Sequence, residues 1–277
     1  MTHHHSSHGL ATLLDRDARV LSEFLTEVTT WFREVTGAQP RPRIADIGAG
    51  TGSGTVALAR AFPGSRVTAI DRTPDMLTRV RDRARDTDVA AAVDTLLADV
   101  NAGWPLAEPI DAAWASASLH EMTDPGRVLS EIRAGLRPGG VLAVIEMNEP
   151  PRFLPRELGL GEPGFEDRLR LAAARARRGP NAHPDWTDLL AEAGLDQVAT
   201  RVFNITVPGG PENPAVAELA ELYFAQIAGG ARPGLSAEDA AVLDLLLAPE
   251  GPHALSNRTD LEFRGPRTAW VVRRPVA

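Results

Sequence analysis

The chain has 277 residues, of which 43% are hydrophobic and 24% are charged, as in an ordinary packed globular protein of one or two domains. Its formal net charge is -8 and its pI is about 5.4, which argues against a nucleic-acid-binding surface, because such a surface needs a basic patch. The composition therefore favours a small, uncharged or cationic partner molecule over DNA or RNA.

Cysteine is absent, so disulfides and thiol ligands play no part. No apolar stretch approaches the roughly 18 residues of a membrane span, and the N-terminus lacks the apolar core of a signal peptide. We therefore expect a cytoplasmic protein without membrane contact. Outside the His-rich residues 1–9, neither an H-x-x-H pair nor a set of paired carboxylates indicates a metal site.

The N-terminal part divides into a tail and a helical region. Residues 1–9 contain four of the seven histidines and are expected to be a disordered, His-rich terminus. Residues 10–40 carry apolar side chains at helical spacing and predict an N-terminal helical region, which Gly37 and Pro40 end.

A strand at residues 44–47 runs into a glycine loop and then a helix at residues 53–60. Such junctions bind nucleotide-like ligands, because glycines without Cβ let a ligand approach the main chain and the helix N-terminus offers free N–H groups. The spacing does not fit the dinucleotide pattern G-x-G-x-x-G from Gly48, where Ser53 occupies the sixth position. Residues 52–57 fit its looser form ending in Ala, but they lie too late for the tight turn after the strand.

The next strand, residues 65–71, ends in Asp71, which follows Gly52 by 19 residues. An acid about 20 residues after the glycine loop binds the ribose hydroxyls of a nucleoside. The alternative interpretation is an Asp that only caps the following helix. Farther along, Asp99 follows a leucine pair, residues 110–122 form a strand and loop, and residues 136–146 hold a helix end, a Pro-Gly-Gly turn and an apolar strand.

In this order, the segments resemble the class I, Rossmann-like S-adenosylmethionine (SAM) methyltransferases, whose motif I is D-x-G-x-G-x-G. The resemblance implies an α/β fold with a seven-stranded, mostly parallel sheet, helices on both faces, and helical N-terminal and lid additions. It implies SAM as cofactor and S-adenosylhomocysteine as product. By this resemblance Asp71 binds ribose, Arg72 and Met76 pack on adenine, and Asp99 accepts the adenine amino group. The cofactor-binding residues that it implies are Asp46, Gly48, Gly50, Gly52, Asp71, Arg72, Met76, Asp99, Val100 and Ala115.

The rest of the chain surrounds a SAM-binding core at residues 41–150. Residues 151–185 are expected to form a lid segment. Residues 186–277 complete the core, with strands at 198–207 and 268–273, and carry a helical insertion at 209–262. The insertion would serve as a lid or as a contact in a homodimer. We favour the lid, because open α/β sheets bind ligands at the carboxyl ends of their strands.

Methyl transfer requires little beyond positioning, since a sulfonium carries its own leaving group, and alignment alone contributes about 7 to 11 kcal/mol. A base is needed only when the acceptor loses a proton. His120 is the first candidate, because it follows the fourth strand and imidazole titrates near neutrality; a purely structural histidine is the alternative. The other candidates are Glu146 and Tyr223, followed by Glu121, His183 and His253.

The predicted function is methyl transfer from SAM to an O, N or C nucleophile of a small, natural-product-like molecule. An electron-rich ring carbon such as indole C3 is one option. One alternative is an NAD(P)-dependent oxidoreductase, disfavoured by the glycine spacing and by the absence of lysine, which removes a Tyr-x-x-x-Lys pair. A non-catalytic SAM-binding regulator is the other.

Overall fold

A single sheet organises the chain, of which the computed structural model describes residues 3–37, 40–176 and 185–276. Its seven strands lie in the order β3-β2-β1-β4-β5-β7-β6. β7 runs antiparallel to both neighbours, and the other strands run parallel. The predicted mostly parallel, seven-stranded fold is thus confirmed. The strands are β1 (Arg43–Ile47), β2 (Arg66–Asp71), β3 (Val93–Leu97), β4 (Ile110–Ser116), β5 (Leu136–Met147), β6 (Asp196–Pro208) and β7 (Glu262–Arg273).

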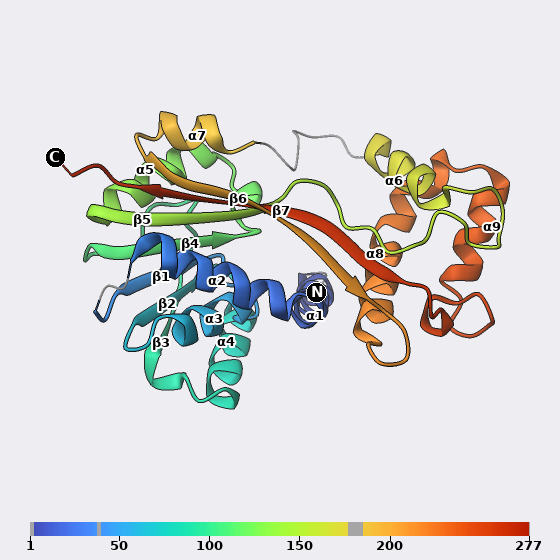
Figure 1. Cartoon of the computed structure of the whole chain (residues 1–277), viewed down its shortest axis with the longest axis horizontal. Helices are drawn as coiled ribbons and strands as arrows, with labels where there is room; N and C mark the ends of the chain where they lie inside the picture. Colours follow the sequence, from blue (N-terminus) through green and yellow to red (C-terminus); the bar gives the residue numbers. More distant parts are fainter. Residues whose placement is uncertain (1–2, 38–39, 177–184, 277) are drawn as a thin grey trace.

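Helices cover both faces of the sheet, because alternate strand residues point to opposite sides (Figure 1). Ile44 and Trp114 face α2 and α3, whereas Ala45 and Ala113 face α5 and α7. The α-helices are α1 (His3–Val20), α2 (Ser22–Thr36), α3 (Ser53–Ala61), α4 (Pro74–Asp86), α5 (Pro125–Gly135), α6 (Phe165–Ala176), α7 (Thr187–Glu192), α8 (Ala215–Ala231) and α9 (Ala237–Leu246). Short 3-10 turns are η1 (Ala90–Ala92), η2 (Leu119–Glu121), η3 (Arg232–Gly234) and η4 (Leu255–Asn257).

Two expectations about element ends need correction. Helix α1 begins at His3, so most of the terminus expected to be disordered, residues 1–9, is helical. Once the rest of α1 is nucleated, each preceding residue adds a hydrogen bond, and a glycine such as Gly9 costs only about 1 kcal/mol. Strand β7 begins at Glu262, so the strand expected at 268–273 is only its second half.

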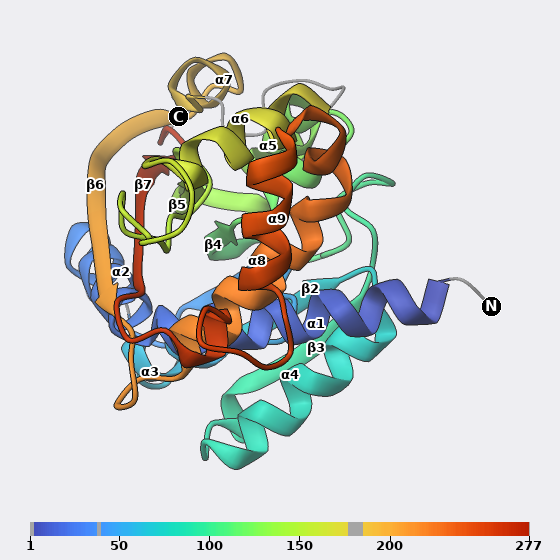
Figure 2. The ribbon, with the colours of Figure 1, turned by 90° about the vertical axis from the view of Figure 1, so that its right-hand side faces the viewer.

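The helical additions gather beyond the carboxyl ends of the parallel strands. Helices α6, α8 and α9, here called the helical cap, lie at the end of the molecule toward which β6 and β7 extend (Figure 1). Figure 2, seen from that end, places α8 and α9 in front of the sheet with α1 crossing below them. Helix α8 packs against α1 and α6.

Buried polar contacts join the parts of the helical cap. Arg168 of α6 binds Asp239 of α9, with Nη2 2.8 Å from Oδ1. The Glu166 carboxylate accepts hydrogen bonds from the backbone N–H groups of Phe153 and Leu154 at 2.9 and 3.0 Å. The expected lid segment and the expected insertion therefore pack as one unit. Within the described residues, no helix has the length and apolarity needed to cross a membrane.

Candidate active site

A cavity of about 640 Å³ opens at the carboxyl edge of the sheet, between the glycine loop, α1 and the helical cap. Its lining includes the predicted residues Asp46, Gly48, Gly50, Asp71, Arg72, Met76, Asp99, Val100, His120 and Tyr223. A second hollow of about 540 Å³ lies beside α1 and α4 and contains none of the predicted site residues. The motifs therefore converge on one pocket.

Two of the motif glycines, Gly48 and Gly52, have different physical roles. Gly48 has a φ of +68°, and a Cβ there would lie 2.6 Å from the Cβ of Ser118, so only glycine lets these two loops meet. Gly52 has a φ of +87°, and its Cβ would lie 2.8 Å from the Cα of Val80 in α4. Gly52 is not part of the cavity lining. Its absence of a side chain serves helix packing, and its contact with the cofactor stays a prediction.

Asp71 connects the end of β2 to the glycine loop. Its Oδ2 accepts a hydrogen bond from the backbone N–H of Gly50 at 3.0 Å, and its Oδ1 accepts one from the N–H of Thr73 at 2.8 Å. Each carboxylate oxygen can accept a further bond. Asp71 can therefore hold the loop and still accept two hydroxyl groups from a ligand.

Asp46 is a buried carboxyl group in the pocket wall, only 3% exposed. Burial raises its pKa to about 7, a hydrogen bond from Thr55 opposes this rise, and the negative charge of Asp71 adds to it. The Oγ1 of Thr55 donates to Oδ2 of Asp46 at 2.6 Å. A cationic ligand bound nearby would favour the ionised form, because an opposite charge lowers the pKa of a carboxyl group.

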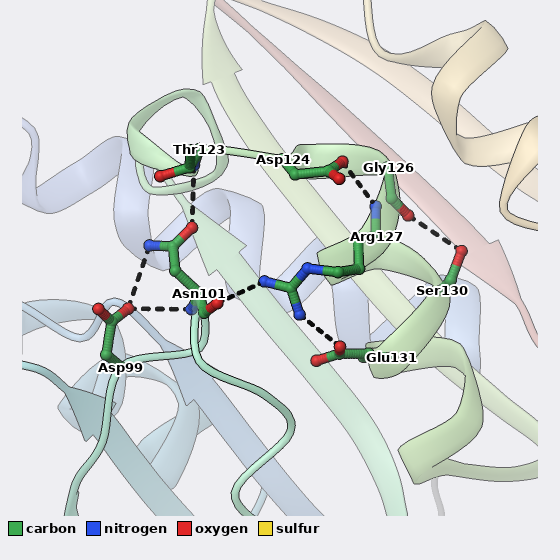
Figure 3. Close-up of polar contacts among 8 residues, drawn as sticks. All are labelled: Asp99, Asn101, Thr123, Asp124, Gly126, Arg127, Ser130 and Glu131. Atoms are coloured by element: carbon green, nitrogen blue, oxygen red, sulfur yellow. Dashed lines mark hydrogen bonds and ion pairs between the residues drawn. The ribbon is translucent and has the colours of Figure 1, made fainter.

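A polar network ties the Asp99 loop to the loop that carries His120 (Figure 3). The Oδ1 of Asp99 accepts hydrogen bonds from the backbone N–H and the Nδ2 of Asn101 at 2.9 and 3.1 Å. The Oδ1 of Asn101 accepts one from the N–H of Thr123 at 2.9 Å, and Arg127 of α5 donates to the Asn101 carbonyl at 2.6 Å. Asn101 thus holds two parts of the pocket wall together.

Ala115 does not reach the pocket. It is 0% exposed and belongs to the core between the sheet and helices α5 and α7. The cavity is instead lined by the next residues, Ser116, Ala117 and Ser118, where β4 ends. The side chain of Ala115 faces away from the pocket, because strand alternation turns it to the far face of the sheet, and its cofactor contact stays a prediction.

His120 and Glu146 form a pair. The Nδ1 of His120 lies 2.8 Å from Oε2 of Glu146, whose side chain is buried. The Oε1 of Glu146 accepts hydrogen bonds from the N–H groups of Ser118 and Leu119 at 3.1 and 3.0 Å. A carboxylate at Nδ1 fixes the tautomer with its proton on Nδ1, so that Nε2 is the ring atom able to accept a proton. Two residues expected as alternative bases therefore lie in direct contact.

The remaining candidate bases are divided among different places. Tyr223 of α8 lines the pocket, and its ring centroid lies 5.6 Å from that of Phe153. Glu121 also lines the pocket, with Oε1 3.5 Å from Nε2 of His120. His253 lies in the turn after α9 and is not part of the lining. His183 lies outside the described residues.

Several lining residues were not predicted from the sequence. Leu219 and Gln226 stand on the same face of α8 as the predicted Tyr223, at helical spacing, a signal that the sequence contains but that marks any packed helix equally. Arg267 lies one residue before the expected start of the last strand, and no motif surrounds it. The unpredicted lining residues beyond the glycine loop include Asn101, Met147, Pro151, Phe153, Leu219, Gln226 and Arg267.

Comparison with known proteins agrees with this geometry. Residues 44–140 match a family described as a methyltransferase domain. Trans-aconitate 2-methyltransferase of Azoarcus sp. (strain BH72) is 34% identical over 151 residues, which cover 53% of this chain and 55% of that protein. The match thus spans about half the length of such curated relatives.

Solved structures share the fold over most of the chain. The structure of the [4+2]-cyclase SpnF is 24% identical and covers 91% of this chain and 82% of that one, with a TM-score of 0.54. A SAM-dependent methyltransferase from Thiobacillus denitrificans, in complex with S-adenosyl-L-homocysteine, is 17% identical and covers 88% and 90%, with a TM-score of 0.50. Residues 44–140 therefore match a methyltransferase domain, and the chain shares its fold with SAM-dependent methyltransferases.

Proposed function

We propose that the protein transfers a methyl group from SAM to a small molecule, with His120 as general base and Glu146 as the residue that positions it. The observation that carries the proposal is the 2.8 Å contact between Nδ1 of His120 and Oε2 of Glu146. It lies in the same pocket as Asp71 and Asp99. A cofactor site and a base therefore face one cavity.

The residues present fit SAM. Acidic groups line the pocket where β1, β2 and β3 end, at Asp46, Asp71 and Asp99, and SAM carries a sulfonium and an ammonium group that opposite charges stabilise. When bound, SAM supplies an electrophilic methyl group together with its leaving group. Asp71 would hold the ribose and Asp99 the adenine amino group. Asp46 would lie close to the cationic end.

His120 would remove a proton from the acceptor through Nε2. The Glu146 carboxylate keeps the ring oriented and stabilises the imidazolium that forms. General base catalysis of this kind contributes about 10² to 10⁴ in rate. This base would serve an acceptor that loses a proton from an O–H group or from an N–H group. It would also serve a ring N–H whose deprotonation activates a ring carbon, such as indole C3. The proposed acceptor is a small, natural-product-like molecule.

The helical cap is proposed as a lid. Helix α8 contributes Leu219, Tyr223 and Gln226 to the pocket, and its other sides pack against α1 and α6 within the same chain. This arrangement favours the lid over the alternative role of the insertion as a dimer contact. The relatives named for trans-aconitate match only about half of the chain, so their acceptor does not by itself identify the acceptor of this protein.

Turnover tests the proposal. The purified protein is incubated with SAM and a metabolite extract, and mass spectrometry follows S-adenosylhomocysteine and products that gain one methyl group. We expect both to appear with the wild type and to fall strongly with His120→Ala. Tight SAM binding without turnover would indicate a non-catalytic regulator. Stabilisation by NAD or NADP alone would favour the oxidoreductase.

A further inference from the structure

A buried guanidinium stands at the end of the pocket opposite the acidic residues. Arg267 of β7 pairs in register with Met147, the last residue of β5, and so follows the strand that carries Glu146. Its side chain is 7% exposed, and its Cζ lies 5.6 Å from the ring centroid of Phe24. In the strand order, β4 and β5 separate it from β1, β2 and β3, which end in the acidic wall.

The protein neutralises this charge only partly. Asp17 of α1 receives both of its contacts from one nitrogen, Nη2, at 3.2 and 3.3 Å, and its side chain is 32% exposed. Among the described residues, Nε and Nη1 of Arg267 donate to no acceptor. A guanidinium binds a carboxylate best through two parallel N–H groups. Arg267 therefore has unused N–H donors at a buried position, where an incompletely paired charge is energetically costly.

The surroundings of Arg267 are apolar. Leu21, Leu25 and Phe24 of the N-terminal helices line the pocket on one side, and Phe153 and Leu219 line it on the other. The pocket contains one other arginine, Arg72, which directly follows Asp71 at the cofactor end. A ligand at the Arg267 end would thus meet hydrophobic walls, one positive charge and the Asp17 carboxylate that partly neutralises this charge.

We propose that Arg267 binds the carboxylate of a largely apolar organic acid, which is the methyl acceptor. This inference rests on the proposed function and specifies its substrate class. It also revises the expectation of an uncharged or cationic acceptor, which came from the net charge. Salt screens the interaction of a ligand with charges more than about 8 Å away. A ligand in direct contact with Arg267 would therefore be attracted by this charge more than it is repelled by distant acids on the surface.

A simpler role for Arg267 would be to fasten α1 to β7 through Asp17, and matched probes separate the two roles. Three acids and their primary amides are titrated calorimetrically into protein saturated with S-adenosylhomocysteine: decanoate, 3-phenylpropanoate and indole-3-acetate. We expect wild type to bind at least one acid about tenfold or more tightly than its amide, as expected for hydrogen bonds between charged groups. Arg267→Met should abolish this preference without changing S-adenosylhomocysteine affinity.

Asp17→Asn is the matched control. It breaks the same ion pair, yet it leaves the guanidinium in place, so the acid preference should persist or increase. Arg267→Lys, which keeps the charge but loses the fork, should retain part of the preference and serves if Arg267→Met does not fold. The inference is overturned if wild type prefers no acid over its amide, or if Asp17→Asn loses the preference as Arg267→Met does. Failure to bind S-adenosylhomocysteine would instead contradict the proposed function.

Discussion

The two ends of the pocket are built in different ways. The cofactor end consists of loops that directly follow β1, β2 and β3, and its acids Asp46, Asp71 and Asp99 lie within or just after short motifs. The acceptor end draws single side chains from α1, β5, α8 and β7, which are far apart in sequence. A short motif can encode a loop whose backbone binds an invariant ligand such as the cofactor. A wall made of side chains from separate elements can change one residue at a time, so it can differ between proteins with different acceptors.

The His120–Glu146 pair should give the largest effect and should act at the acceptor end alone. We expect His120→Ala to lower turnover by about 10² to 10⁴, because the proton acceptor is lost. Glu146→Gln should lower it as well, since an amide stabilises the imidazolium less. Steady-state kinetics with isothermal titration of SAM checks this, with Glu121→Gln as control. If both variants keep wild-type turnover, methyl transfer proceeds by proximity alone.

Asp46 should couple the cofactor end to pH. Its folded pKa of about 7 lies above the ordinary pKa of 3.8 for an aspartate, so its contribution to stability is full below pH 4 and is lost as the pH rises toward 7. Asp46→Asn should therefore stabilise the ligand-free protein at pH 8 by up to about 4 kcal/mol relative to its effect at pH 4. It should also weaken SAM binding, because the opposite charge disappears.

Denaturant unfolding of wild type and Asp46→Asn at several pH values measures this difference. Thr55→Val serves as the comparison, since it removes the hydrogen bond that opposes the pKa rise. An effect of Asp46→Asn that is equal at pH 4 and pH 8 would contradict an elevated pKa.

Asp71→Ala should affect the cofactor end without changing acceptor recognition. Hydrogen bonds to a charged group contribute about 1.5 to 3 kcal/mol, so SAM affinity should fall roughly ten- to hundredfold or more. The same change releases Gly50 and Thr73, and part of the loss would come from a looser glycine loop. Calorimetric titration decides, with Asp82→Ala on the exposed side of α4 as control. Unchanged SAM affinity would mean that Asp71 does not bind the ribose.

Asn101→Ala should give the smallest effect and should reach both ends. It breaks the hydrogen bonds to Asp99 and Thr123, each worth about 0.5 to 1.5 kcal/mol. We therefore expect the KM values for SAM and for the acceptor to rise several-fold together. Ser130→Ala, which removes a hydrogen bond to the Gly126 carbonyl in the same region (Figure 3), should change neither. A rise in only one KM would mean that the ends are independent.

The cofactor end was largely predictable because its chemistry follows the local chain. A strand that ends in glycines and a second strand that ends in an acid must place these groups at one sheet edge, since parallel strands share their carboxyl ends. Gly52 and Ala115, predicted as cofactor-binding residues, are not part of the cavity lining. The surroundings of Gly52 depend on how α4 packs against the glycine loop. The face on which Ala115 lies depends on how β4 packs in the sheet.

The sequence alone determined the fold, the pocket edge and the acids proposed to bind the cofactor, because these follow from short-range patterns. Tertiary structure alone decided that His120 and Glu146 form one pair. They come from the ends of two adjacent parallel strands, and no local pattern records the distance between such ends. It also decided that Arg267 enters the pocket. The antiparallel pairing of β7 with β5 and the contact with Asp17 of α1 fix where that charge lies.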